Sequence, residues 1–295
     1  MKNKYKVIGV ITARMSSRRL PGKVMKPLCG KSVFAHHLER LRSISELDGV
    51  YLVTSLELEN MPLIAEAKRL DVPYYEGEKE DVLERHEKIV RISAASAIIR
   101  ITCDMPLFDI PTVSAYIEAY NEYQPDYIYP ANFNLLNGTM CELVSAGAII
   151  KAHKFYKGPA ITKYIIEHPE EFKMKGVAVR NDICRTDVRL DLDFPEDYEL
   201  INKIYVKLYR GRPIALEDAY GFLDDNPSLI LINKFRAHNE AASYVQRLLY
   251  KPVFQVIKSG EQYEIINELG QQVKYSDFMD KLKGFFVKQG GDKIG

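Results

Sequence analysis

The sequence predicts an α/β protein with three layers, α/β/α, around a mostly parallel sheet. Two observations predict this class: short apolar runs of strand length recur through the first half of the chain, and amphipathic segments with helical spacing separate them. Strands that alternate with helices pair in parallel, because each helix crosses back over the sheet. With 295 residues, the chain is long enough for one large domain or two modest ones.

Five strands are predicted in the first half of the chain, each on an apolar or β-branched run. These strands cover residues 7–12, 49–54, 73–75, 97–102 and 127–129. Four helices are predicted between them, on apolar residues spaced three and four positions apart. These helices cover residues 33–43, 61–70, 81–93 and 111–121. Parallel strands that are crossed by helices on both faces give a Rossmann-like sheet.

The second half of the chain is less regular. Residues 132–157 are rich in loop-forming residues and end in a predicted helix over 145–153, and another helix is predicted over 161–168. A predicted strand over 188–192 runs into an acidic turn. The helix predicted over 196–209 follows, and acidic residues fill its first turn, as the helix dipole favours.

The pattern changes again near residue 248. Two strand-like runs, over 253–257 and 263–266, flank a Ser-Gly turn and predict a hairpin. An amphipathic helix is predicted over 275–287. We therefore predict two units: a domain over 1–247 that carries the sheet, and a small α+β appendage over 248–295.

Composition excludes several classes of partner. Lys and Arg number 41 and Asp and Glu number 40, so no net field attracts nucleic acid or an anionic membrane. No apolar stretch approaches the length of a membrane span, and the first apolar run is too short for a signal peptide. The four cysteines are far apart and form no C-x-x-C pair, which indicates free thiols in a reducing compartment. We expect a soluble cytoplasmic protein with no nucleic-acid and no membrane partner.

A loop of small residues after the first predicted strand carries four cations. They are Arg14, Arg18, Arg19 and Lys23. Parallel sheets bind phosphates at the carboxyl ends of their strands, where small side chains let backbone N–H groups approach the ligand. Guanidinium groups bond two phosphate oxygens at once. The loop therefore predicts a polyphosphate site, whereas Lys26 and Lys31 are expected to be solvated surface cations.

Two glycine motifs are excluded for this loop. Gly30-Lys31-Ser32 resembles the end of a P-loop, but that motif needs a glycine five residues before Gly30, where Met25 stands. No G-x-G-x-x-G follows the first strand, so the dinucleotide-binding motif is missing as well. The alternative interpretation of the cations is a solvated basic loop without a ligand.

Carboxylates follow two other predicted strands. Asp104 comes just after the strand over 97–102, and Asp191 and Asp193 flank the end of the strand over 188–192. Aspartates at neighbouring strand ends are able to hold Mg²⁺ while phosphate oxygens and water complete its coordination. The alternative is that these residues cap turns and helices. That alternative is favoured for Asp191, and also for Asp109 and Asp197, whereas the nearby cations favour a metal role for Asp104 and Asp193.

Residues 13–28 read Ala-Arg-Met-Ser-Ser-Arg-Arg-Leu-Pro-Gly-Lys-Val-Met-Lys-Pro-Leu. This segment resembles the signature of the cytidylyltransferases that activate sugar acids. It is most similar to the spore-coat polysaccharide (SpsF-like) branch, a relative of the acylneuraminate and Kdo cytidylyltransferases. Further segments resemble that branch in the same order along the chain. They are 53–55, 77 with 80–85, 100–107, 137–142, 189–201, 222–227 and 238–240. The resemblance covers about residues 5–247.

The resemblance implies CTP and Mg²⁺ as ligands, a sugar acid as acceptor, and a homodimer. The residues that it assigns to the CTP phosphates are Arg14, Ser17, Arg19 and Lys23. Those placed near the nucleotide are Asp81, Arg85 and Arg100, with Thr54 and Ser55 near the base. The implied metal ligands are Asp104, Asp193 and Asp191, and the implied acceptor contacts are Asn132, Gly138 and Glu142. The predicted catalytic residues are Arg14, Lys23 and Asp104.

Two of these assignments have an ordinary structural alternative. Arg85 and Asp81 are four residues apart on a predicted helix, a spacing that suits a surface ion pair. Thr54 and Ser55 equally suit polar residues at a strand end.

The implied reaction is attack by a sugar-acid hydroxyl on the α-phosphorus of CTP, with pyrophosphate as the leaving group. Such a reaction needs alignment and charge neutralisation rather than a covalent nucleophile. His36, His37 and His86 are therefore expected to be packing or surface residues.

Some residues depart from the family pattern. Met140 stands where an acid is usual, and residues 158–160, Gly-Pro-Ala, stand where Arg-Glu-His is common. Both lie in the region that the resemblance assigns to the sugar and the dimer partner, so they suit a different acceptor or weaker catalysis. Two alternative functions follow. One is a nucleotide-sugar glycosyltransferase, because residues 191–193 form a D-x-D motif; the other is a catalytically silent nucleotide-binding homologue that acts as a scaffold subunit.

Overall fold

The structure is a computed structural model that describes residues 5–131, 138–178, 180, 185, 187–236, 255–259 and 262–266. Contacts within the chain define two compact units, Met1–Ser243 and Tyr244–Gly295. The boundary predicted from the sequence lies four residues later. Asn132 and the helix predicted over 275–287 lie outside the described residues.

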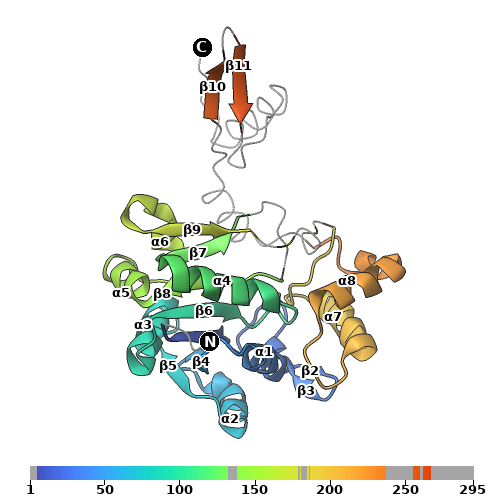
Figure 1. The fold of residues 1–295 in the computed structure, drawn as a ribbon. Coiled ribbons are helices and arrows are strands. Elements are labelled where there is room, and N and C mark those ends of the chain that lie inside the picture. The colour runs from blue at the N-terminus through green and yellow to red at the C-terminus, as the bar shows by residue number, and fades with distance from the viewer. Residues whose placement is uncertain are drawn as a thin grey trace, which may run out of the picture. The chain divides into compact units, whose positions relative to one another are not determined.

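The first unit is built on a seven-stranded sheet with the order β5-β4-β1-β6-β8-β7-β9 (Figure 1). Its strands are β1 (Val7–Thr12), β4 (Val50–Ser55), β5 (Tyr74–Gly77), β6 (Ala97–Thr102), β7 (Tyr127–Pro130), β8 (Glu142–Ser145) and β9 (Met174–Val177). All neighbours pair in parallel except β8, which runs antiparallel to both β6 and β7. Helices flank this sheet, so the predicted three-layer, mostly parallel fold is confirmed.

Eight α-helices are described. They are α1 (Val33–Arg42), α2 (Met61–Arg69), α3 (Val82–Ser93), α4 (Ile110–Tyr123), α5 (Ala146–Phe155), α6 (Lys163–Glu167), α7 (Pro195–Leu208) and α8 (Leu216–Asp225). Four of them begin at a polar side chain that accepts a hydrogen bond from a backbone N–H three residues ahead. These caps are Ser32, Asp81, Asp109 and Ser145. None of the described helices combines the length and the apolar character that crossing a membrane requires.

Shorter elements complete the first unit. A small antiparallel ribbon joins β2 (Pro27–Leu28) to β3 (Lys31–Ser32). Short 3-10 helices are η1 (Lys23–Met25), η2 (Leu58–Asn60), η3 (Pro169–Glu171) and η5 (Pro227–Ile232).

The central strands β1 and β6 are buried on both faces, as expected of a parallel sheet covered by helices. Ile8, Val10, Ile98 and Ile99 are all fully buried. The register pairs Thr12 with Thr102, the last residue of each strand. The loops that follow β1 and β6 therefore leave the sheet side by side at its carboxyl edge.

The prediction of a strand over residues 188–192 is wrong. Within this segment only Arg189 makes an isolated bridge, and β8 takes the place beside β6 in the sheet. The backbone of the segment is instead tied to the loop after β6, where the Leu192 N–H donates to the Asp104 carbonyl at 2.8 Å. The sequence analysis also missed β8 and β9, both of only four residues.

The second unit contains a β-hairpin within the described residues. Strands β10 (Gln255–Ser259) and β11 (Gln262–Ile266) pair antiparallel, with Ser259 opposite Gln262. The predicted hairpin is therefore present, with its first strand two residues later than expected.

The histidines predicted as packing or surface residues are buried in the core. His37 and His86 have no exposed surface, and each bonds through Nδ1 to a backbone carbonyl of its own helix. Burial outweighs these hydrogen bonds and lowers the pKa of His37 to about 4 and that of His86 to about 3. Both rings are therefore neutral at about pH 7.

These two histidines predict acid sensitivity. Below about pH 6.5 the unfolded chain protonates both imidazoles, whereas the folded protein does not until about pH 4 or lower. The unfolded state then binds more protons, so the free energy of unfolding falls as the pH falls. We expect each histidine to contribute a loss of about 1.5 kcal/mol between about pH 6.5 and about pH 5. Burial raises the pKa of Asp191 to about 7, which acts in the opposite direction over this range, so the loss is read by urea unfolding as the difference between the wild type and a variant that lacks the ring.

The variant His37→Phe is the control, because it removes one titrating ring beside Phe108. The number of protons that the chain takes up on unfolding at about pH 5 should be lower by about one in this variant. If the free energy of unfolding of His37→Phe depends on pH over this range in the same way as that of the wild type, the assignment of a neutral, buried His37 ring is contradicted.

Candidate functional site

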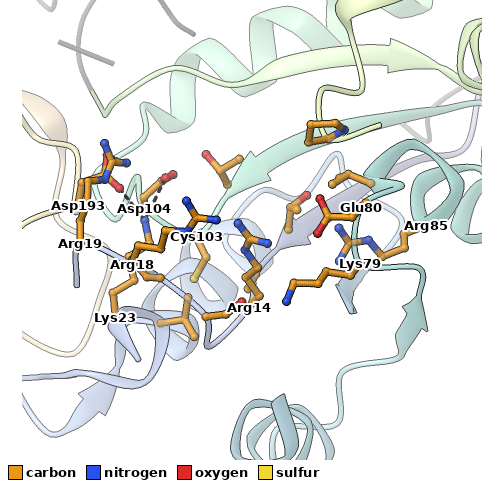
Figure 2. Close-up of a pocket in the computed structure, with 18 of the residues that line it drawn as sticks. Arg14, Arg18, Arg19, Lys23, Lys79, Glu80, Arg85, Cys103, Asp104 and Asp193 are labelled. Carbon is orange, nitrogen blue, oxygen red and sulfur yellow. Dashed lines mark hydrogen bonds and ion pairs between the residues drawn. The ribbon is translucent and has the colours of Figure 1, made fainter. Parts of the chain in front are cut away.

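A cavity of about 590 Å³ opens at the carboxyl ends of β1 and β6 (Figure 2). The ends of these strands and the loops that follow them supply most of its wall. The lining residues are Thr12, Ala13, Arg14, Ser16, Ser17, Arg18, Arg19, Lys23, Val24, Lys79, Glu80, Val82, Arg85, Arg100, Thr102, Cys103, Asp104, Pro159 and Asp193. The cationic loop and two of the predicted aspartates thus meet in one cavity.

The cationic loop is folded by its own backbone and by one buried asparagine. The Met15 N–H donates to Asn60 Oδ1 at 2.8 Å, and the Gly22 N–H donates to the Met15 carbonyl at 3.1 Å. Gly22 adopts a left-handed conformation with φ of 64°, which closes the turn before η1. Buried Leu20 and Val24 anchor the far side of the loop. This fixed loop presents its cations to the cavity.

Lys23 bridges the two carboxylates of the cavity. Its Nζ lies 3.2 Å from Asp104 Oδ2 and 2.9 Å from Asp193 Oδ1, and Arg19 Nη2 lies 2.7 Å from Asp193 Oδ2. Burial alone would raise the pKa of Asp104, but the Lys23 charge and hydrogen bonds from Thr102 and Lys23 outweigh it and hold the pKa at about 2. The site is therefore a cluster in which the Lys23 ammonium group lies between the side chains of Asp104 and Asp193.

A second arginine, which sequence reasoning missed, holds the acidic segment together. Arg189 is buried and contacts three aspartates: Asp197 at 3.1 Å, Asp191 at 2.9 Å and Asp193 at 3.5 Å. Asp197 in turn accepts from the Asp193 N–H at 2.9 Å and from Asn233 Nδ2 at 2.8 Å. The signal in the sequence was the run Arg-Leu-Asp-Leu-Asp, in which Arg189 immediately precedes the acids.

Asp191 does not line the cavity. Burial, followed by the charges of Asp104, Asp193 and Asp197, raises the pKa of Asp191 to about 7 despite its ion pair with Arg189. Its predicted role as a metal ligand remains a prediction that this position outside the lining does not favour.

Arg85 lies at the end of the cavity away from Asp104 and Asp193, near Lys79 and Glu80 (Figure 2). It is 2% exposed, and its Nε has no hydrogen-bond partner. Asp81 does not pair with it: Asp81 caps α3 and bonds to His153 Nε2 at 3.0 Å. The helix-surface interpretation of Arg85 is therefore wrong, and its guanidinium is a buried cation on the cavity wall.

Arg100 lines the cavity and is held from behind by Glu142. Its Nη1 donates to Glu142 Oε2 at 2.7 Å, and the Tyr127 hydroxyl donates to the other carboxylate oxygen at 2.6 Å. Glu142 itself does not line the cavity. In this arrangement Glu142 orients Arg100 rather than facing a ligand directly.

Thr54 and Ser55 are fully buried and also lie outside the lining. Asn60 Nδ2 donates to the Ser55 carbonyl at 2.8 Å and to its hydroxyl at 3.0 Å. Because Asn60 also holds Met15, Ser55 supports the cationic loop from the neighbouring strand.

The structure therefore divides the predicted site residues into two groups. Those that line the cavity are Arg14, Ser17, Arg19, Lys23, Arg85, Arg100, Asp104 and Asp193. Those outside the lining are Thr54, Ser55, Asp81, Asp191, Gly138 and Glu142. Lining residues that the sequence analysis assigned no role include Thr12, Lys79 and Glu80. Cys103 also lines the cavity, but burial raises the pKa of its thiol, which disfavours it as a nucleophile.

Gly138 has a structural reason to be glycine. Its φ is +91°, and a Cβ at this position would lie 2.2 Å from the Asp191 backbone nitrogen and 2.2 Å from the Leu190 carbonyl carbon. The loop before β8 therefore packs directly against the backbone of the acidic segment. This close approach helps to fix the position of the segment that carries Asp193.

A family model described as cytidylyltransferase matches residues 8–219. Spore coat polysaccharide biosynthesis protein SpsF of Bacillus subtilis is 28% identical over 230 residues, which cover 75% of this chain and 95% of that protein.

Solved structures share the fold. A cytidylyltransferase from Leptospira borgpetersenii has a TM-score of 0.71 at 23% identity and covers 80% of this chain and 99% of its own. A CMP:2-keto-3-deoxy-manno-octonic acid synthetase complexed with CTP has a TM-score of 0.54 at 13% identity and covers 68% of this chain and 99% of its own.

The packing of Gly138 predicts a large effect of one methyl group. Gly138→Ala should lower the free energy of unfolding by about 3 kcal/mol or more, because the Cβ meets backbone atoms that cannot move without displacing the acidic segment. Chemical denaturation measures this loss.

The matched control is Gly211→Ala. Gly211 has a φ of +80°, but a Cβ there meets nothing within 4 Å. This variant should lose only the backbone term of about 1 kcal/mol. Equal losses in the two variants would show that the contact with Asp191 is unimportant.

Proposed function

Because the chain belongs to the cytidylyltransferase family, we propose that it transfers CMP from CTP to the hydroxyl of a sugar acid and releases pyrophosphate. We place this reaction in the biosynthesis of a surface or spore-coat polysaccharide. The observation that carries the proposal is the meeting of the cationic loop with Asp104 and Asp193 in one cavity. A relative named for spore coat polysaccharide biosynthesis supports the pathway. A synthetase with the same fold, complexed with CTP, supports the nucleotide.

The cationic loop suits the triphosphate of CTP. Arg14, Arg18 and Arg19 line the cavity on a loop whose backbone is fixed by Asn60 and Gly22. A preorganised set of donors stabilises phosphate charge without reorganising during the reaction. These cations favour a nucleoside triphosphate as ligand over a nucleoside diphosphate sugar, which carries less negative charge. The family match likewise favours a nucleotidyltransferase over a glycosyltransferase.

Asp104 and Asp193 fit a divalent cation that is shared with phosphate. The two carboxylates already bond one ammonium group, that of Lys23. Mg²⁺ is commonly held by one or two carboxylates, with substrate phosphates and water as the remaining ligands. No group of three His, Cys, Asp or Glu side chains among the described residues could hold a metal by itself, which suits a metal that arrives with CTP. When bound, Mg²⁺ would neutralise the negative charge that develops on the transferred phosphoryl group.

The chain's own residues supply alignment. Arg14 and Lys23 come from the loop after β1, whereas Arg100 comes from β6 and is oriented by Glu142, so two elements of the fold supply cations to an anion in the cavity. The attacking hydroxyl of the acceptor then reacts with the α-phosphorus while pyrophosphate leaves, with no covalent intermediate.

The central test is Asp104→Ala. We expect at least a hundredfold lower rate of pyrophosphate release with CTP, Mg²⁺ and a panel of sugar acids, because one of the two carboxylates is removed. The exposed Asp225→Ala is the control and should keep the wild-type rate. A wild-type rate in Asp104→Ala would refute the metal assignment. A wild-type protein that binds CTP but turns over no sugar acid would instead identify a silent binding homologue.

Lys23 gives a second test, because its ammonium occupies the position between the two carboxylates. Lys23→Met should bind Mn²⁺ roughly tenfold more tightly in the absence of nucleotide, since no internal cation competes for Asp104 and Asp193. The same variant should bind CTP more weakly, because a phosphate ligand is lost. Electron paramagnetic resonance of free Mn²⁺ measures the first effect.

Lys26→Met is the control, because the Lys26 ammonium lies over the Tyr198 ring, 5.1 Å from its centroid, and has no part in the bridge. Unchanged or weaker Mn²⁺ binding by Lys23→Met would contradict the proposed competition.

A further inference from the structure

His86 is a buried histidine that the proposed function does not use, yet it touches the cavity wall through one partner. It lies in α3, next to Arg85, and has no exposed surface. Its Nδ1 lies 2.8 Å from the Val82 carbonyl oxygen, and its Nε2 lies 3.1 Å from Thr12 Oγ1. Thr12 ends β1 and lines the cavity.

The hydrogen bonds of His86 fix which atom carries the proton. A carbonyl oxygen only accepts, so Nδ1 must carry the hydrogen. Burial lowers the pKa of His86 to about 3, and the charges of Arg100 and Arg85 act in the same direction, so the ring is neutral and has a single N–H. Nε2 is therefore a bare lone pair.

The direction of the Thr12 bond follows. Because Nε2 can only accept, the Thr12 hydroxyl must donate its one hydrogen to His86. The oxygen of Thr12 then has only lone pairs left for the cavity. His86 thus converts a hydroxyl that could donate or accept into a group that only accepts.

Because the Thr12 oxygen can only accept a hydrogen bond, it can bond to some groups of a nucleotide and not to others. Ionised phosphate oxygens carry no hydrogen, so they gain nothing from Thr12. A partner must donate an N–H or an O–H. Thr12 is joined through His86 to α3, whose Arg85 lies at the end of the cavity away from Asp104 and Asp193 (Figure 2). The part of CTP that lies away from the metal-binding carboxylates is the nucleoside.

We propose that Thr12, held by His86, is a specificity-determining residue that accepts a hydrogen bond from the exocyclic amino group of cytosine. Uracil presents a carbonyl at the same position, so its lone pairs would face those of Thr12. Thr12 and His86 together would therefore favour the binding of CTP over that of UTP. This inference rests on the proposed function, because it requires a nucleotide in this cavity.

Thr12→Val tests the hydroxyl with little change in shape. We expect CTP to bind about tenfold more weakly, whereas UTP should bind at least as tightly as it does to the wild type, because the lone pairs that face the uracil carbonyl are gone. The probe that isolates the amino group is the pyrimidin-2-one ribonucleoside triphosphate, which lacks it. Thr12→Val should not change the affinity for this analogue. Titration calorimetry with Mg²⁺ measures all three affinities.

His86→Phe tests the positioning role of the histidine. Without Nε2 the Thr12 hydroxyl can rotate and donate, so UTP should gain affinity while CTP loses it, and the ratio of the two should approach one. A histidine that served only packing would weaken both nucleotides equally. In the Thr12→Val background, His86→Phe should leave the CTP-to-UTP ratio unchanged, because the hydroxyl it controls is gone.

Several outcomes overturn the inference. Equal wild-type affinities for CTP and UTP, or equal losses of both in Thr12→Val, exclude Thr12 as the selector while leaving CTP binding intact. If Thr12→Val loses its effect with 2′-deoxy- or 3′-deoxy-CTP rather than with the analogue that lacks the amino group, the donor is a ribose hydroxyl and the base assignment is wrong. A wild-type protein that binds none of these triphosphates overturns the proposed function, and this inference with it.

Discussion

The parallel pairing of β1 with β6 is the constraint on which the site depends. Their register places Thr12 beside Thr102, so the loops after both strands start at the same point of the sheet edge. One loop carries the cations and the other carries Asp104. The Cys103 N–H continues the ladder by donating to the Thr12 carbonyl at 3.0 Å. A shift of either strand by one residue would turn its side chains to the opposite face and separate these loops.

The acidic segment is brought to the same point by charge rather than by a sheet. Four aspartates lie close together, and such a group repels itself unless cations are placed among them. Arg189, which is buried, forms ion pairs with three of these aspartates, and the cavity-lining Lys23 and Arg19 form ion pairs with Asp193. Removing one partner of such a buried pair leaves an uncompensated charge, which costs far more than the pair itself contributes. The position of Asp193 is thus tied to the position of the cationic loop.

The sequence was informative where the signal is local. Strand-length apolar runs and apolar residues with helical spacing predicted the central strands and helices, and strand ends predicted the positions of the cations and Asp104. It failed where the outcome depends on distant partners. Residues 188–192 have a strand pattern, but β8 occupies the adjacent edge. Arg85 has the spacing of a surface pair, yet tertiary packing buries it. The hydrogen bond from Met15 to Asn60 joins two segments that no local pattern connects.

The charges around the cavity also affect the hydrogen bond between His86 and Thr12. His86 is buried beside Arg85 and Arg100, and its burial and these cations together disfavour a proton on its ring. Burial is the main cause, and the same charges that attract a polyphosphate help it to keep His86 neutral and its Nε2 free to accept. A carboxylate near His86 would favour the imidazolium, which would donate from Nε2 and let Thr12 donate toward the cavity instead. The direction of the Thr12 hydrogen bond thus depends both on the burial of His86 and on the cations beside it.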